Sequence, residues 1–71
     1  MTDNARNYIV AYKASRRASE AREALPPGSS RAKVTSANAR WKSAAEERDR
    51  LFLLLSDEER AWADASVRRL A

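Results

Sequence analysis

Four basic residues in the first quarter of the chain are the clearest candidates for binding chemistry. They are Arg6, Lys13, Arg16 and Arg17. Their spacing gathers them on one side of a helix, where guanidinium and ammonium groups could follow a phosphate backbone. Glu20 interrupts the strip, and neither glycines nor aromatic residues alternate with it. A strip of this kind is usually a solvated helix surface, so DNA or RNA binding through it is the alternative hypothesis for this chain.

The remaining polar residues do not suggest an enzyme. The chain contains no histidine and no cysteine, which removes imidazole and thiolate chemistry and disulfides. Its carboxylates fall in patterns typical of helix surfaces and helix starts, such as Glu46–Glu47 and 57–59. A phosphate-cradling loop needs several glycines, and Gly28 is the only one. We therefore expect no catalytic residue, no metal, no cofactor and no small-molecule substrate.

An apolar run at residues 51–55 points instead to a protein partner. It holds more apolar residues than one side of a helix can carry, so Leu53 and Leu54 would point away from the buried stripe. Exposed leucines beside charged residues are typical of a patch that a partner covers, although a following helix could also fold over them. The predicted partner interface consists of Leu51, Leu53, Leu54 and Trp62. The partner is expected to be another protein or a second copy, with a homodimer as the favoured oligomer.

The elements that position these residues are predicted to be helices. One column of residues recurs every seven positions: Val34, Trp41, Arg48, Leu55 and Trp62. Such a column stays on one side of a helix and faces another helix. Trp41 is expected in the core, whereas Trp62 fits a core or an interface equally well. Arg48 is expected to pack its stem and carry its guanidinium to the surface.

The segment Leu25-Pro26-Pro27-Gly28-Ser29-Ser30 divides two helices, because prolines and glycine favour a turn and a serine can cap the next helix. We predict helices over about 4–24 and 31–55, antiparallel because their connection is short. The first has an apolar stripe made of Val10, Ala11, Ala14, Ala18, Ala21 and Leu25. Ile9 falls on the polar side, which the first helix alone does not explain.

A third helix over about 57–69 is predicted from a capping box. Ser56 would cap its first turn, and Glu59 would reach back to the backbone N–H of Ser56. The alternative is one continuous helix over 31–70, because no glycine or proline interrupts residues 53–56.

Composition supports an all-α fold: a small helical bundle forming a single domain over 1–71. Alanine and arginine are frequent and favour helices, whereas β-branched residues are few. The net charge of +4 is compatible with nucleic acid without requiring it. No run of about 20 apolar residues is present, which predicts no membrane partner. The first residues lack the layout of a secretory signal, so a cytoplasmic location is expected.

Residues 25–41, LPPGSSRAKVTSANARW, resemble small helical proteins of unknown function from actinobacteria and their phages. The resemblance implies a GC-rich bacterial or viral source and no activity. Together with the apolar run, it leads to the hypothesis of a non-enzymatic protein–protein interaction module with a regulatory or accessory role, encoded by a bacterium or by one of its phages. A structural part of a virion is a further alternative.

Overall fold

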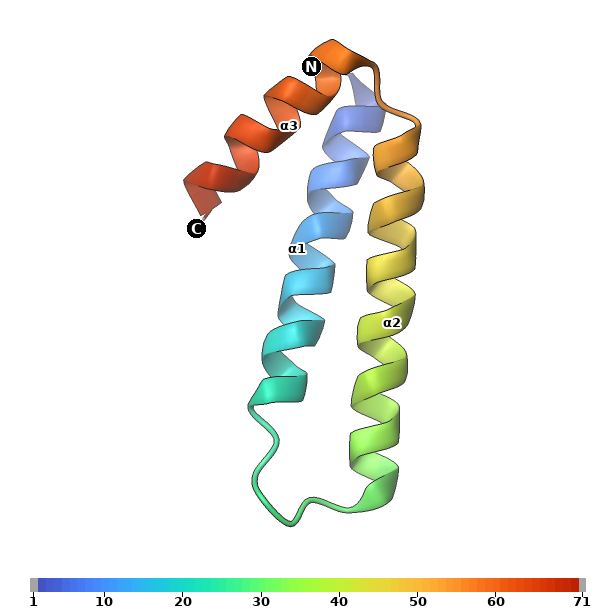
Figure 1. Ribbon diagram of the computed structural model, residues 1–71, viewed down its shortest axis with the longest axis vertical. Coiled ribbons are helices and arrows are strands. Elements are labelled where there is room, and N and C mark those ends of the chain that lie inside the picture. The colour runs from blue at the N-terminus through green and yellow to red at the C-terminus, as the bar shows by residue number, and fades with distance from the viewer. Residues whose placement is uncertain (1, 71) are drawn as a thin grey trace.

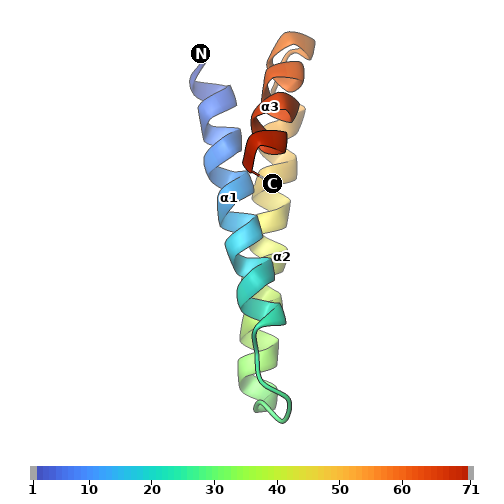
Figure 2. The same ribbon diagram turned by 90° about the vertical axis from the view of Figure 1, so that its left-hand side faces the viewer.

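Three α-helices account for most of the chain in the computed structural model, which describes residues 2–70 (Figure 1). The helices are α1 (Asp3–Glu23), α2 (Arg31–Leu53) and α3 (Asp57–Leu70). α1 and α2 lie antiparallel, and α3 folds back from the end of α2 towards α1 (Figures 1 and 2). No strand is present within residues 2–70. The predicted all-α arrangement is confirmed, and each predicted helix end lies within two residues of the observed one.

Serine and glycine form the connection between α1 and α2. The hydroxyl of Ser30 accepts the backbone N–H of Lys33 at 3.2 Å and so caps α2. Ser29 instead donates its hydroxyl to the carbonyl oxygen of Pro26 at 2.6 Å, inside the turn. Gly28 has a φ of 83°, a conformation that a residue with a side chain rarely adopts. Of the two serines that the sequence offers as a cap, the structure selects Ser30.

The chain breaks between α2 and α3 without a glycine or a proline. The backbone N–H groups of Leu54 and Leu55 bond to carbonyls three residues earlier, which closes α2. Ser56 then begins α3: its hydroxyl accepts the N–H of Glu59 at 3.1 Å, and Glu59 accepts the N–H of Ser56 at 2.9 Å. These reciprocal bonds are the predicted capping box. The continuous-helix alternative is therefore wrong, because the box satisfies the backbone groups that a continuous helix would have paired.

The core lies where all three helices meet, at the end that contains the α2–α3 turn. Its buried members are Ala5, Tyr8, Leu55 and Ala63, with Ile9, Tyr12, Leu51, Phe52, Trp62 and Val67 partly buried against them. The rings of Tyr8 and Phe52 are tilted, with their centroids 5.3 Å apart, an arrangement that favours aromatic contact. Ile9, unexplained by the first helix alone, packs into this cluster, to which α3 contributes Ala63.

The buried side of α1 differs from the apolar stripe expected from sequence. Tyr8, Ala11 and Ser15 are buried, whereas Val10 is 67% exposed. The expected stripe was therefore rotated too far towards the alanines, because α1 buries a tyrosine and a serine in contact with its neighbours. Ser15 is satisfied in that position, since its hydroxyl donates to the carbonyl of Tyr12 at 2.8 Å.

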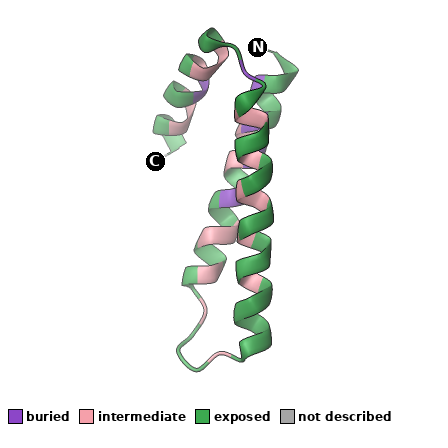
Figure 3. Ribbon diagram, turned by 45° about the vertical axis from the view of Figure 1, so that its right-hand side comes forward, coloured by how far each residue is buried: buried purple, intermediate pink, exposed green. Residues whose placement is uncertain are grey.

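The hairpin is thinly packed towards its α1–α2 turn, where Figure 3 shows mostly exposed and intermediate residues. None of the residues of α2 is buried. Trp41 is half-buried beneath the guanidinium of Arg22, whose carbon lies 4.4 Å from the ring centroid. Arg48 is half-buried as well; it donates to Ser15 at 3.5 Å and to Asp49 at 3.0 Å. Along this part of the hairpin, the contacts of Arg22 with Trp41 and of Arg48 with Ser15 thus take the place of an apolar core.

The molecule is a thin rod with principal extents of 45 × 21 × 14 Å. Its radius of gyration is 14.1 Å. A compact domain of the same length would have a radius of about 11 Å. A helix with its side chains is about 10–12 Å across, so over much of its length the rod is one layer of helices thick. Since domains usually bury their apolar sides between two layers, one side of this hairpin is left uncovered.

Candidate protein–protein interface

An apolar groove runs between α1 and α2 close to the predicted interface. It is lined by Asn7, Val10, Ala11, Ala14, Glu47, Arg50 and Leu51. Val10 exposes two thirds of its surface here, and Leu51 is half-buried. Large apolar side chains left open beside a groove are typical of a surface that another protein covers.

A second groove continues the first towards the α1–α2 turn. It is lined by Ala18, Ala21, Leu25, Ala32, Lys33, Ser36, Ala37 and Arg40. Ala21 follows Ala14 by seven residues, and Glu47 follows Arg40 by seven. Residues seven apart lie on nearly the same side of a helix, so the two grooves open on one side of the hairpin. We call this surface the open face and define it by Val10, Ala14, Ala21, Arg40, Glu47 and Leu54.

The open face lies away from α3. Tyr12 and Leu70 line a common hollow, so Tyr12 marks the side of α1 that is turned to α3. Val10 precedes Tyr12 by two residues, a rotation of about 200° around the helix. Val10 and Tyr12 thus point to nearly opposite sides of α1, and α3 cannot cover both.

Leu53 and Leu54 remain uncovered. Leu53 is 74% exposed and Leu54 is 55% exposed, so α3 does not fold over them. Leu54 follows Glu47 by seven residues and extends the open face to the end of α2. Leu53 lies about 100° further round the helix and points to the outer side of α2. Only Leu54 of the pair therefore continues the open face.

Trp62 is separated from the leucines of the predicted interface. It is half-buried on α3, where it packs against the core cluster and lines a hollow with Thr2, Glu58 and Glu59. The structure therefore brings Leu51 and Leu54 to the open face, leaves Leu53 on the outer side of α2, and places Trp62 on a different surface.

An ion pair lies beside the first groove, the one that contains Val10 and Leu51. Arg50 donates to both carboxylate oxygens of Glu47, at 2.7 and 3.0 Å. This hydrogen bond lowers the pKa of Glu47 and raises that of Arg50, so Glu47 is negatively charged at neutral pH. The open face thus combines apolar side chains with a fixed carboxylate at its rim.

The four residues of the basic strip on α1 have different surroundings. Arg16 is engaged, because it pairs with Glu20 at 3.3 Å and donates to the carbonyl of Leu70 at 2.8 Å. Arg6, Lys13 and Arg17 are exposed, and no ion pair within residues 2–70 involves them. Three of the four residues thus point to solvent, while Arg16 connects α1 to α3.

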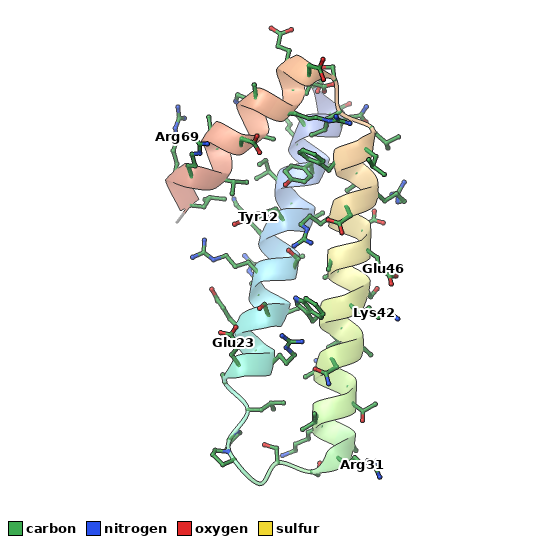
Figure 4. All side chains as sticks on the ribbon, viewed as in Figure 1. Tyr12, Glu23, Arg31, Lys42, Glu46 and Arg69 are labelled. Carbon is green, nitrogen blue, oxygen red and sulfur yellow. The ribbon has the colours of Figure 1, made fainter. Side chains whose placement is uncertain are left out.

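A second basic segment, which the sequence interpretation missed, lies near the α1–α2 turn. Residues 24–45 carry four basic side chains and no acidic one, whereas residues 46–59 carry six acidic side chains and two arginines. The first segment therefore has a charge of +4 and the second a charge of −4. Figure 4 shows Arg31 at the turn, and Lys42 and Glu46 on the side of α2 turned away from α1. Counting charge along the chain would have revealed this separation.

No group of three or more histidine, cysteine, aspartate or glutamate residues within residues 2–70 is arranged to hold a metal ion. Over the same residues, no helix is both long enough and apolar enough to cross a membrane. Comparisons with protein-family models, with curated proteins and with solved structures found no match to this chain.

Proposed function

We propose that the protein is a non-enzymatic helical interaction module that acts by docking its open face on another helical surface, in a regulatory or accessory role in the cytoplasm. The observation that supports this most directly is the exposure of Val10 in a groove that also contains the half-buried Leu51, together with the exposure of Leu54 at the end of α2. Covering apolar surface stabilises an association by roughly 25 cal/mol per Å². An uncovered apolar side on a rod one helix layer thick therefore favours a partner.

Photo-crosslinking at single positions tests this function. A photoreactive phenylalanine analogue replaces Val10 or Leu54 in the full chain, in the cells that produce the protein. Lys42 is the matched control, because it is exposed on the side of α2 turned away from α1. We expect a discrete crosslinked product from positions 10 and 54 and none from position 42. Equal yields from all three positions, or no product from any, would contradict an interaction through the open face.

Polar substitution gives an independent check of the same surface. Leu53→Ser combined with Leu54→Ser is expected to weaken association through the loss of Leu54 from the open face, and to leave the helix content unchanged, since both side chains are exposed. Light scattering measures the mass, and circular dichroism measures the helix content. If the native chain associates and the double variant shows the same mass, the two leucines do not take part in the association.

Nucleic-acid binding is the second candidate function, favoured by the exposure of Arg6, Lys13 and Arg17 on α1. Such binding would weaken steeply with salt, because phosphate contacts release counterions. Fluorescence anisotropy with duplex and single-stranded DNA measures it, and Lys13→Glu with Arg17→Glu should abolish it. Absence of salt-sensitive binding would remove this candidate and leave the interaction module untouched.

A further inference from the structure

Along α2, the charged residues at the rim of the open face are arranged so that they are complementary to those of a second, antiparallel copy. Lys33, Arg40, Glu47 and Leu54 follow one another at intervals of seven residues on α2. Two copies of this column lying antiparallel would place Arg40 of each copy opposite Glu47 of the other, and Lys33 opposite Leu54. Two parallel copies would instead place like charges together, which is unfavourable.

Resting on the proposed function above, we propose that the partner of the open face is a second copy of this chain, packed antiparallel about a two-fold axis. The axis must exchange Arg40 with Glu47, so it crosses α2 next to Ser43 and Ala44. Such an interface is isologous: each copy contributes the same surface, and each contact occurs twice. The long stem of Lys33 then covers Leu54 of the other copy.

The contacts within the hairpin show which part of α1 lies at the level of this axis. Trp41 lies beneath Arg22, and Arg48 contacts Ser15, so the axis crosses α1 between residues 15 and 22. Within that stretch, Ala18 and Ala21 line the second groove, the one nearer the α1–α2 turn. Their small side chains let the two α1 helices approach closely, since interaxial distance depends on the side chains at the contact. The alanine-rich side of α1, which α2 does not bury, thereby gains a partner.

The exposed area of the monomer matches the size of such an interface. The chain exposes 5298 Å², whereas a compact protein of its mass of 8.0 kDa would expose about 4,450 Å². The excess, about 850 Å², is close to the roughly 800 Å² that each partner buries in a standard interface. One dimer interface per chain therefore returns the exposed area to that of a compact protein.

The wider charge distribution favours the same orientation. The +4 segment of residues 24–45 and the −4 segment of residues 46–59 occupy opposite ends of α2 and its flanking turns. In an antiparallel pair, each segment lies beside its opposite in the other copy. The attraction between them should weaken as salt shortens the screening length to about 10 Å at 0.1 M.

A charge exchange at the central pair tests the proposal on the full chain. Sedimentation equilibrium at low salt measures the dissociation constant of the native chain and of Arg40→Glu, Glu47→Arg and the double variant. Each single variant places two like-charged pairs in the dimer and should weaken it about tenfold. The double variant restores opposite charges across the axis and should recover the native constant within about threefold. If the double variant weakened the dimer by the sum of the free-energy losses of the two single variants, the antiparallel pairing would be overturned.

Disulfide trapping gives a second test. Because the chain contains no cysteine, only the introduced residue can form a disulfide. Ser43 lies midway between Ser36 and Arg50, which line the two grooves at intervals of seven residues. Ser43→Cys should form a covalent dimer with itself under mild oxidation. Asn38→Cys is the matched control, because it is exposed about 140° away around α2. Equal trapping at both positions would contradict the proposed axis.

The solution mass separates failure of this dimer from failure of the proposed function. A monomer at every concentration up to the millimolar range overturns the dimer. Crosslinks from positions 10 and 54 to a different protein would still support docking through the open face. Their absence, together with a monomeric mass, would overturn both.

Discussion

Thr2 and Glu59 join the beginning of α1 to the beginning of α3. The Thr2 hydroxyl donates to one carboxylate oxygen of Glu59, while the other oxygen accepts the backbone N–H of Ser56 at 2.9 Å. Thr2 also caps α1 by accepting the N–H of Ala5 at 3.3 Å. One carboxylate, 57 residues from Thr2 in sequence, thus connects the caps of two helices.

Glu59→Gln should make the stability of the protein less sensitive to a fall in pH. The backbone N–H of Ser56, and then the Thr2 hydroxyl, lower the pKa of Glu59. A carboxyl group whose pKa is lowered by folding stabilises the fold at neutral pH and loses that contribution as the pH falls through its folded pKa. We expect Glu59→Gln to lower the melting temperature at pH 7 and to match the native chain below the folded pKa. An equal difference at both pH values would show that this carboxylate charge is not involved.

Ser56→Ala should destabilise α3 through the loss of its cap. Removing a serine cap costs about 1 kcal/mol, which lowers the melting temperature of a small domain by roughly 4–8 °C. Asn38→Ala is the control, because Asn38 is exposed within α2, lies away from the proposed dimer axis, and alanine is the better helix former. Thermal unfolding followed by circular dichroism compares the two variants. A loss as large in Asn38→Ala as in Ser56→Ala would contradict the role assigned to the cap.

Leu55→Ala and Leu53→Ala should differ sharply although they lie two residues apart. Leu55 is 5% exposed in the core, whereas Leu53 is 74% exposed. We expect Leu55→Ala to lower the free energy of unfolding by about 2–5 kcal/mol and Leu53→Ala to change it by about 0.5 kcal/mol or less. Urea unfolding at one fixed protein concentration measures both values. Similar values would show that the α2–α3 turn does not bury Leu55.

Arg22 and Trp41 should show a measurable coupling energy. The guanidinium carbon lies 4.4 Å from the ring centroid, a distance at which a cation attracts the face of an aromatic ring. A double-mutant cycle with Arg22→Gln and Trp41→Leu should give about 0.5–1 kcal/mol, because the pair is only partly buried. A coupling energy of zero would mean that the stacking does not contribute to the stability of the hairpin.

Local sequence patterns were sufficient for the helices and their caps. The Ser56–Glu59 box and the cap at Ser30 depend on residues within one turn, so the sequence carries the whole signal. The break after Leu53 follows from the same box. The apolar run itself could not locate it, since five consecutive residues look alike until one of them, Leu55, enters the core.

The direction in which α1 faces its neighbours could not be predicted from α1 alone. Alanines contribute little burial, so the apolar stripe carried little information about orientation. Contacts with α3 and α2 instead bury Tyr8 and Ser15 and draw Ile9 into the core. The same distant packing leaves Val10 and Leu54 on the open face. That surface is therefore visible only once the three helices are placed together.

The position of the core has a consequence for how the chain acquires its fold during synthesis. Ala5 and Tyr8 are synthesised before Leu55 and Ala63, the residues that pack with them in the core. Loop closure across such a separation in sequence must come before its contacts can stabilise anything. A nascent chain therefore displays the core residues of α1 and α2 without their α3 partners until α3 emerges, and only then can the core be completed.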